Sequence, residues 1–189
     1  MATRQDVLDW LAEIEAGVIH LDDDNSGMAS AAIALIDVGT EEGELPPGYL
    51  TEHFTLAEMI YSDTAKAMGV DNYPDSRETE NLQRVCDVLE LIRSLCGDDP
   101  VVVSSGYRCP EVNAAVGGVP DSAHVQGLAA DITIPDYGTT TQICEAVSPY
   151  LEEWKIDQLI DETGGGARWV HVGLCDPPEA ARCECFKLG

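Results

Sequence analysis

The chain has 189 residues, of which 44% are hydrophobic and 24% are charged, a composition typical of a folded domain and unlike that of a disordered protein. Its formal net charge of -25, from 35 acidic and 10 basic side chains, would repel nucleic acids and anionic membrane surfaces, so neither is expected as a partner. An acidic, lysine-poor surface suits surroundings of high salt, although it is equally compatible with an ordinary soluble acidic protein.

Residues 1–48 are predicted to form an acidic N-terminal arm. Apolar residues from Asp6 to Ile14 follow helical spacing, and Gly17 can end that helix. The next stretch, LDDDNSG, resembles a calcium-binding loop only loosely, because the alternation of ligands and the distal Glu are missing, and a solvated turn is favoured. The sequence GTEEGELPPG is typical of a linker, which places the start of the main domain near Tyr49.

Neither a secretory signal nor a membrane span is expected. The start MATRQDVLDW lacks the succession of basic, apolar and small residues that a signal requires. The longest apolar stretch, around residues 29–36, is far shorter than the roughly 20 residues that a bilayer requires. If the protein acts outside the cell that makes it, another agent must deliver it.

The main domain, residues 49–175, is predicted to begin with helices. Thr55 can cap a helix at FTLAEM, where Glu58 stands at the position that completes a capping box. A longer helix is predicted from Asp75 until Gly97, because apolar residues recur at helical spacing between them. Cys86 and Cys96 belong to this apolar stripe and are interpreted as small core residues.

Strands and shorter helices are predicted to follow. VVVSS is a short β-branched run typical of a buried strand, Pro110 begins a short helix, and ADITI indicates a second strand. TTTQICEAVSPYLEEW is predicted to be a helix, and KIDQLIDE and RWVHVGL are predicted to pair as a hairpin across TGGGA. This order indicates an α+β fold with a small, mostly antiparallel sheet flanked by helices.

The chain has seven cysteines, an odd number, so at least one is unpaired within a monomer. Cys175, Cys183 and Cys185 lie close together in sequence, the last two in the C-terminal tail, residues 176–189. A thiolate metal site is one interpretation of this group. Packing or disulfide roles are favoured, because no CxxC pair is present.

Two of the four histidines indicate a metal site. His124 lies in a predicted loop ahead of Asp131 at a strand entrance, and Gly127 gives the backbone room to turn between them. His171 lies within a predicted strand, on the same face as Trp169. Two imidazoles and one carboxylate can bind Zn²⁺ and leave a fourth position for water. The alternative is that these histidines have only structural roles.

Four motifs carry a resemblance to a known family. VSSGYR, SAHVQGLAAD and DQLIDE followed by WVHV, in that order, resemble the zinc D-alanyl-D-alanine carboxypeptidase family and its phage endolysin relatives. The stretch HFTLAEMIYSDTAKAMGVDN is similar to the start of that domain in tailed-phage proteins. The resemblance covers about Glu52 to Leu174. It implies a Hedgehog/DD-peptidase-like fold, a Zn²⁺ cofactor and hydrolysis of peptidoglycan stem or cross-link peptides.

The resemblance also implies roles for single residues. The three candidate ligands named above match the zinc ligands of the family. Arg108 matches an arginine that holds the substrate carbonyl or carboxylate and stabilises the charge of the tetrahedral intermediate. Ser122 matches a serine that supports the site by hydrogen bonding. Tyr107 and Trp169, beside these positions, are expected to bind substrate or to support the ligands.

The general base departs from the usual family pattern. Several members have an acidic residue three positions before the last histidine, where this chain has Arg168. Glu162 matches the glutamate of the phage-type DQLI-x-E motif and is the expected base. Asp161 is the second candidate, although strand alternation directs it to the opposite face.

Two classes of function remain open from the sequence. The first is a zinc metallopeptidase of carboxypeptidase or endopeptidase type, phage-encoded, acting as a lysin or from the virion. The second is a weak or inactive protein of a virus particle in which zinc is a structural staple. In both, the N-terminal arm and the tail would contact virion partners, and the protein would be located in the virion or in the host cytoplasm before release.

Overall fold

The computed structural model describes residues 45–176 and 180–189. The chain divides into two compact units, Met1–Pro47 and Gly48–Gly189. The helix predicted from Asp6, the LDDDNSG loop and most of the linker lie outside the described residues. In the part of the chain that is described, no helix is both long enough and apolar enough to cross a membrane.

The second unit begins with three helices, α3 (Leu56–Met59), α4 (Asp63–Met68) and α5 (Ser76–Leu95). The Thr55 hydroxyl caps α3 by accepting a hydrogen bond from the Glu58 backbone N–H. Asp75 and Glu78 form a complete capping box at the start of α5. Both predicted helix starts are confirmed, whereas α4 had not been predicted.

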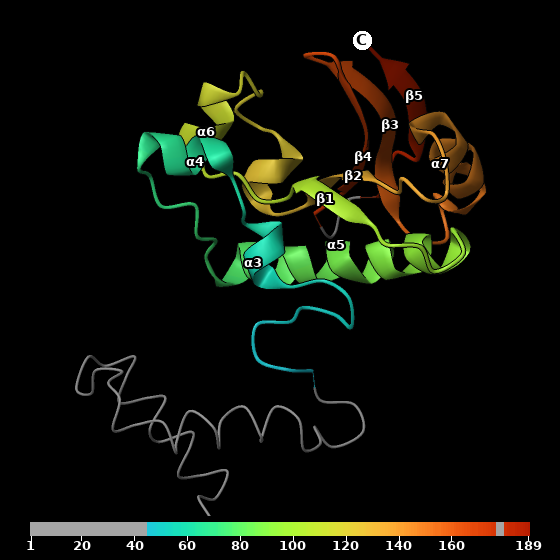
Figure 1. Ribbon diagram of the computed structural model, residues 1–189, viewed down its shortest axis with the longest axis horizontal. Helices are drawn as coiled ribbons and strands as arrows, with labels where there is room; N and C mark the ends of the chain where they lie inside the picture. The colour runs from blue at the N-terminus through green and yellow to red at the C-terminus, as the bar shows by residue number, and fades with distance from the viewer. Residues whose placement is uncertain (1–44, 177–179) are drawn as a thin grey trace, which may run out of the picture. The chain divides into compact units, whose positions relative to one another are not determined.

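The sheet has five strands in the order β1-β2-β4-β3-β5. The strands β1 to β4 pair antiparallel, and β5 pairs parallel with β3 (Figure 1). The α+β class with a mostly antiparallel sheet is therefore confirmed, and the sheet is mixed because β5 is parallel to β3. The bounds are β1 Val102–Ser105, β2 Ala129–Thr133, β3 Ile156–Gly164, β4 Ala167–Leu174 and β5 Glu184–Leu188.

The predicted hairpin is present as β3 and β4. The predictions for the first strand and for the helix before the hairpin are corrected. The first strand, β1, is an edge strand, which leaves Val102 48% exposed where a buried strand had been predicted. The predicted long helix is divided into α7 (Thr140–Val147) and a 3₁₀ turn, η3 (Ser148–Tyr150). Pro149 has no N–H to continue the α-helix, and the Ser148 hydroxyl instead donates to the Glu145 carbonyl.

The core lies on one face of the sheet, where α5 and α7 pack against Leu159, Val170 and Val172. Cys86 and Cys96 are fully buried in this core, as predicted. The other face carries the polar cluster described below. Two short elements lie near it, α6 (Pro110–Ala115) and the 3₁₀ helix η2 (Ala123–Gln126).

Candidate metal centre

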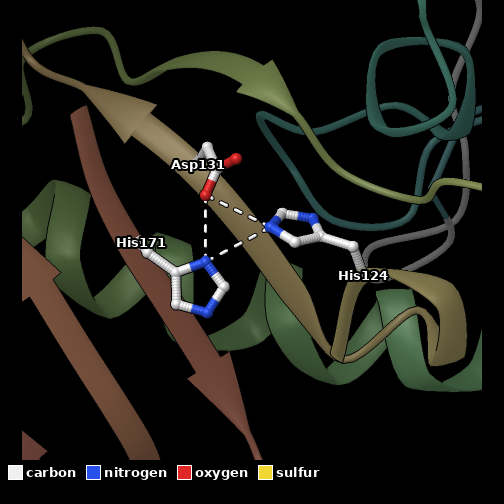
Figure 2. Close-up of side chains that lie close together, drawn as sticks. All are labelled: His124, Asp131 and His171. Atoms are coloured by element: carbon white, nitrogen blue, oxygen red, sulfur yellow. Dashed lines mark hydrogen bonds and ion pairs between the residues drawn. The ribbon is translucent and has the colours of Figure 1, made fainter. Parts of the chain in front are cut away.

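Three side chains from separate elements converge on the second face of the sheet: His124, Asp131 and His171 (Figure 2). His124 Nε2 lies 3.2 Å from Asp131 Oδ1 and 3.2 Å from His171 Nδ1, and the last two atoms are 2.9 Å apart. All three residues are buried. Within the described residues this is the only group of three or more His, Cys, Asp or Glu side chains placed to hold a metal ion, so the C-terminal cysteines form no such group there.

The sheet register accounts for two of these positions. Asp131 on β2 is the direct partner of His171 on β4, so both side chains project from the same face. His124 reaches them from η2, which ends at Gly127. Gly127 has a φ of 68°, a left-handed conformation that glycine adopts without a steric penalty. The turn at Gly127 lets the chain enter β2 at Ala129, five residues after His124.

The protonation of His124 follows from its second nitrogen. Nδ1 lies 2.6 Å from the carbonyl oxygen of Gly106, and a carbonyl can only accept, so Nδ1 carries the hydrogen. In the neutral ring, Nε2 then carries the lone pair that a metal ion can bind. A backbone carbonyl that fixes a histidine in this way is typical of metal-binding histidines.

The separations within the cluster fit a zinc ion. Zinc bonds to nitrogen and oxygen of roughly 2.0 to 2.1 Å in a tetrahedral site place the ligand atoms about 3.3 Å apart. The three observed separations, 2.9 to 3.2 Å, are close to this value. Two imidazole nitrogens and one carboxylate oxygen also form a donor set common in catalytic zinc sites.

Asp131 is held as a carboxylate. Burial acts to raise its pKa, but the interactions with His124 and His171 outweigh burial and hold the pKa well below its usual range. Its second oxygen, Oδ2, lies 2.5 Å from Arg108 Nη2, and its backbone oxygen accepts a hydrogen bond from Ser104. The ionised form that a metal requires is therefore the favoured form here.

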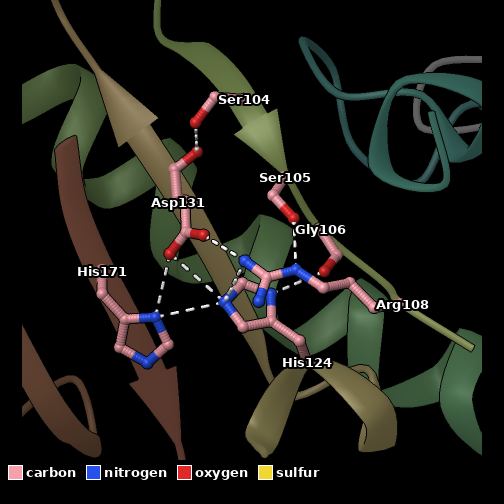
Figure 3. Close-up of polar contacts among 7 residues, drawn as sticks. All are labelled: Ser104, Ser105, Gly106, Arg108, His124, Asp131 and His171. Carbon is pink, nitrogen blue, oxygen red and sulfur yellow. Dashed lines mark hydrogen bonds and ion pairs between the residues drawn. The ribbon is translucent and has the colours of Figure 1, made fainter. Parts of the chain in front are cut away.

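Arg108 lies beside the ligands, as Figure 3 shows. Its Nε donates to Ser105 Oγ at 2.8 Å, and its Nη2 lies against Asp131 and 3.3 Å from His124 Nε2. Its backbone N–H donates to the His124 carbonyl. Arg108 thus contacts two of the three candidate ligands, in addition to the substrate contact that its motif implies.

Asn72, which is not among the predicted site residues, fixes the segment that carries Arg108. Its amide nitrogen donates to the carbonyls of Ile60 and Tyr107, and its amide oxygen accepts from the Cys109 backbone N–H. Asn72 therefore binds the backbone on both sides of Arg108. The signal available was its place at the end of HFTLAEMIYSDTAKAMGVDN, the stretch similar to the start of the domain in tailed-phage proteins.

A cleft opens over the cluster. A cavity of about 690 Å³ contains the three candidate ligands in its wall, together with Ser105, Arg108, Ser122, Glu162 and Trp169. A second cavity of about 620 Å³ shares Ser122, Glu162 and His171 with the first. Glu162 and His171 thus border both cavities.

Two predicted site residues, Asp161 and Tyr107, lie outside both cavities, whereas Ser122 lies in the wall of both. Asp161 projects from the core face of β3, where it accepts hydrogen bonds from Thr140, Thr141 and Arg168. This geometry removes Asp161 from the candidate site and explains the place of Arg168, which is its partner. Tyr107 is buried in the hydrophobic core and lines neither cavity. Ser122 is a wall residue whose side chain makes no cap hydrogen bond with η2.

A model of the family described as peptidase M15 matches residues 52–172. The chain belongs to the M15 peptidase family. The resemblance stated from the four motifs is thereby confirmed, and the matched region contains all three candidate ligands, Arg108 and Glu162. M15 peptidases are typically zinc-dependent, in agreement with the donor set.

No curated protein matches the chain. Strand β5 lies beyond the M15 match.

Proposed function

We propose that the protein is a zinc-dependent peptidase that cleaves peptidoglycan stem or cross-link peptides containing D-amino acids. The observation that carries the proposal is the convergence of His124 Nε2, Asp131 Oδ1 and His171 Nδ1 in the wall of a cleft that also contains a carboxylate. Membership of the M15 family supports the reaction class. The D-amino-acid substrate and a phage origin rest on the motif resemblance.

Zinc held by these three side chains would polarise the substrate carbonyl and lower the pKa of a water towards about 7. Glu162 is the proposed base. It lies one strand across and two residues along from His171, about 8 Å between backbone positions. The two side chains project from the same face of the sheet into the same cleft, where a water on the zinc could lie between them. Glu162 takes a proton from the attacking water and returns it to the leaving amine. Arg108 donates to the oxygen on which negative charge develops.

Two variants test this proposal. Purified protein should contain one equivalent of zinc, and His171→Ala should lose it. With peptidoglycan fragments, the wild type should release new amines, and Glu162→Gln should release none while keeping its zinc. Asp161→Asn is the matched control, since that carboxylate is the neighbour of Glu162 on the opposite face of β3 and should be dispensable for cleavage. Activity in zinc-loaded Glu162→Gln would exclude Glu162 as the base.

A structural role for the zinc is the second candidate. Arg168 occupies the position where several relatives have an acidic residue, and it is paired with Asp161 on the other face of the sheet. If the wild type binds one equivalent of zinc but releases no amine from any fragment, the zinc has only a structural role in the fold.

The N-terminal arm and the segment after Leu174 are proposed to contact other virion proteins in both cases. A pull-down of purified virion components with and without residues 1–48 tests this.

A further inference from the structure

Strand β5 lies outside the family match but borders the cleft. Its pairing with β3 sets Leu188 opposite Glu162 and Lys187 opposite Asp161. Side chains alternate along a strand, so Leu188 lies on the face of Glu162, and Lys187 lies on the face of Asp161. Leu188 accordingly lines the larger cavity, although the strand that carries it is not part of the matched domain.

Leu188 is one of several apolar side chains exposed in that cavity. Leu188 is 55% exposed and Val119, in the loop before η2, is 62% exposed. Tyr61 and Val116 are also exposed and line the same cavity. Exposed apolar side chains gathered from three separate segments around one hollow are typical of a binding surface.

Polar contacts hold β5 in place from the face of the sheet that carries Asp161. Lys187 Nζ donates to Thr141 Oγ1 at 3.1 Å and lies 3.5 Å from Asp161. Before the strand, the Arg182 backbone N–H and guanidinium both donate to Asp157. These contacts fix the strand without the help of Leu188, whose side chain is left exposed in the cleft.

We propose that β5 is a specificity element of the peptidase: Leu188, with Val119, forms an apolar subsite for an aliphatic side chain of the peptide substrate. The inference rests on the proposed function and adds the substrate feature that the cleft selects. Asp63 and Glu162 line the same cavity, so acidic side chains would be repelled there, and small uncharged ones such as alanine would be accepted.

The sheet geometry sets the length of peptide that reaches this subsite. Leu188 lies two strands across and two residues along from His171, which corresponds to about 12 Å. An extended peptide spans this distance with roughly three to four residues. A dipeptide bound at the metal centre would therefore not reach Leu188, whereas a pentapeptide would.

Peptide binding to the zinc-loaded Glu162→Gln protein tests the subsite without turnover. In that background, Leu188→Ala should weaken binding of an alanine-rich pentapeptide about 5- to 10-fold and leave binding of an alanyl dipeptide unchanged. Val102→Ala is the matched control, because Val102 is similarly exposed on the opposite edge strand and lines neither cavity. Zinc content and Tm should be the same in both variants, since both side chains are exposed.

The outcomes separate the two proposals. If Leu188→Ala weakens the binding of the pentapeptide and the dipeptide equally, or weakens the binding of neither, the subsite is overturned. This holds even if the wild type cleaves peptidoglycan fragments. Length-dependent binding that is lost in Leu188→Ala, with no cleavage by the wild type, supports the subsite and overturns the proposed activity. If neither peptide binds and no fragment is cleaved, both proposals fail.

Discussion

His171 Nε2 lies so close to Gly173 that a β-carbon at residue 173 would be only 3.1 Å away. The two residues are two positions apart on β4, so they face the same side of the sheet. The other nitrogen of this ring, Nδ1, belongs to the ligand cluster. Glycine at position 173 therefore lets the imidazole lie along the strand in the orientation that directs Nδ1 to Asp131.

Gly173→Ala is expected to weaken zinc binding about 10-fold, because the added methyl group displaces the His171 ring from its position beside Asp131. Competition with a chromophoric chelator measures the affinity. Gly164→Ala serves as the control: its β-carbon would meet only the far end of the Trp169 ring, so zinc affinity should not change. Equal affinities in both variants would show that the contact with Gly173 does not orient the ligand.

Replacement of Arg108 by lysine is expected to lower the activity as much as replacement by alanine. Its guanidinium contacts Ser105 and Asp131 with separate nitrogens, 2.8 Å and 2.5 Å away, and an ammonium group cannot reproduce this fork. Arg108→Lys and Arg108→Ala should each lower kcat about 100-fold while zinc remains bound. Steady-state kinetics with metal analysis measures both quantities. A lysine variant with wild-type kcat would mean that positive charge alone is sufficient.

Asn72→Ala is expected to lower the free energy of unfolding by about 2 to 3 kcal/mol, because it leaves the buried polar groups around Arg108 without partners. Urea denaturation of the zinc-loaded protein measures the change. Asn72→Asp keeps the acceptor for the Cys109 N–H but sets a carboxylate oxygen against the carbonyl oxygens of Ile60 and Tyr107, so it should be at least as destabilising as Asn72→Ala. Wild-type stability in the alanine variant would contradict the structural role.

The candidate metal centre was predictable from the sequence because local rules position its parts. The period of two along a strand fixes the face of His171, and a glycine that permits a turn brings His124 back towards Asp131. The start of α5 was equally predictable, since Asp75 and Glu78 cap it by contacts only three residues apart. These signals are short-range, and the sequence displays them directly.

Features set by distant neighbours were not accessible. The run containing Val102 has the same composition whether its strand is central or at an edge, and only the strand order decides its exposure. Strand β5 pairs in parallel with β3, 26 residues earlier at Gln158 and Glu184, and no turn signal accompanies such a connection. The burial of Tyr107 likewise depends on α3, whose Met59 carbonyl accepts its backbone N–H.

Asp161 makes the stability of the fold depend on pH. Burial acts to raise its pKa, but hydrogen bonds from Thr140, Thr141 and Arg168 outweigh burial and lower the pKa from 3.8 to about 2. A carboxyl group whose pKa is lower in the folded state binds fewer protons there than in the unfolded chain. Its stabilising contribution is therefore fully present above about pH 4 and is lost as the pH falls towards 2.

Asp161→Asn should consequently lower the free energy of unfolding by about 2 kcal/mol near neutral pH, and the difference from the wild type should shrink between about pH 4 and pH 2. Urea denaturation at a series of pH values measures this. Asp98→Asn is the control, because its partner Arg93 forms an ion pair with it at the surface, where such pairs contribute less than about 1 kcal/mol. A difference for Asp161→Asn that is constant down to about pH 2 would mean that the ionised carboxylate is not what stabilises the contact between α7 and β3.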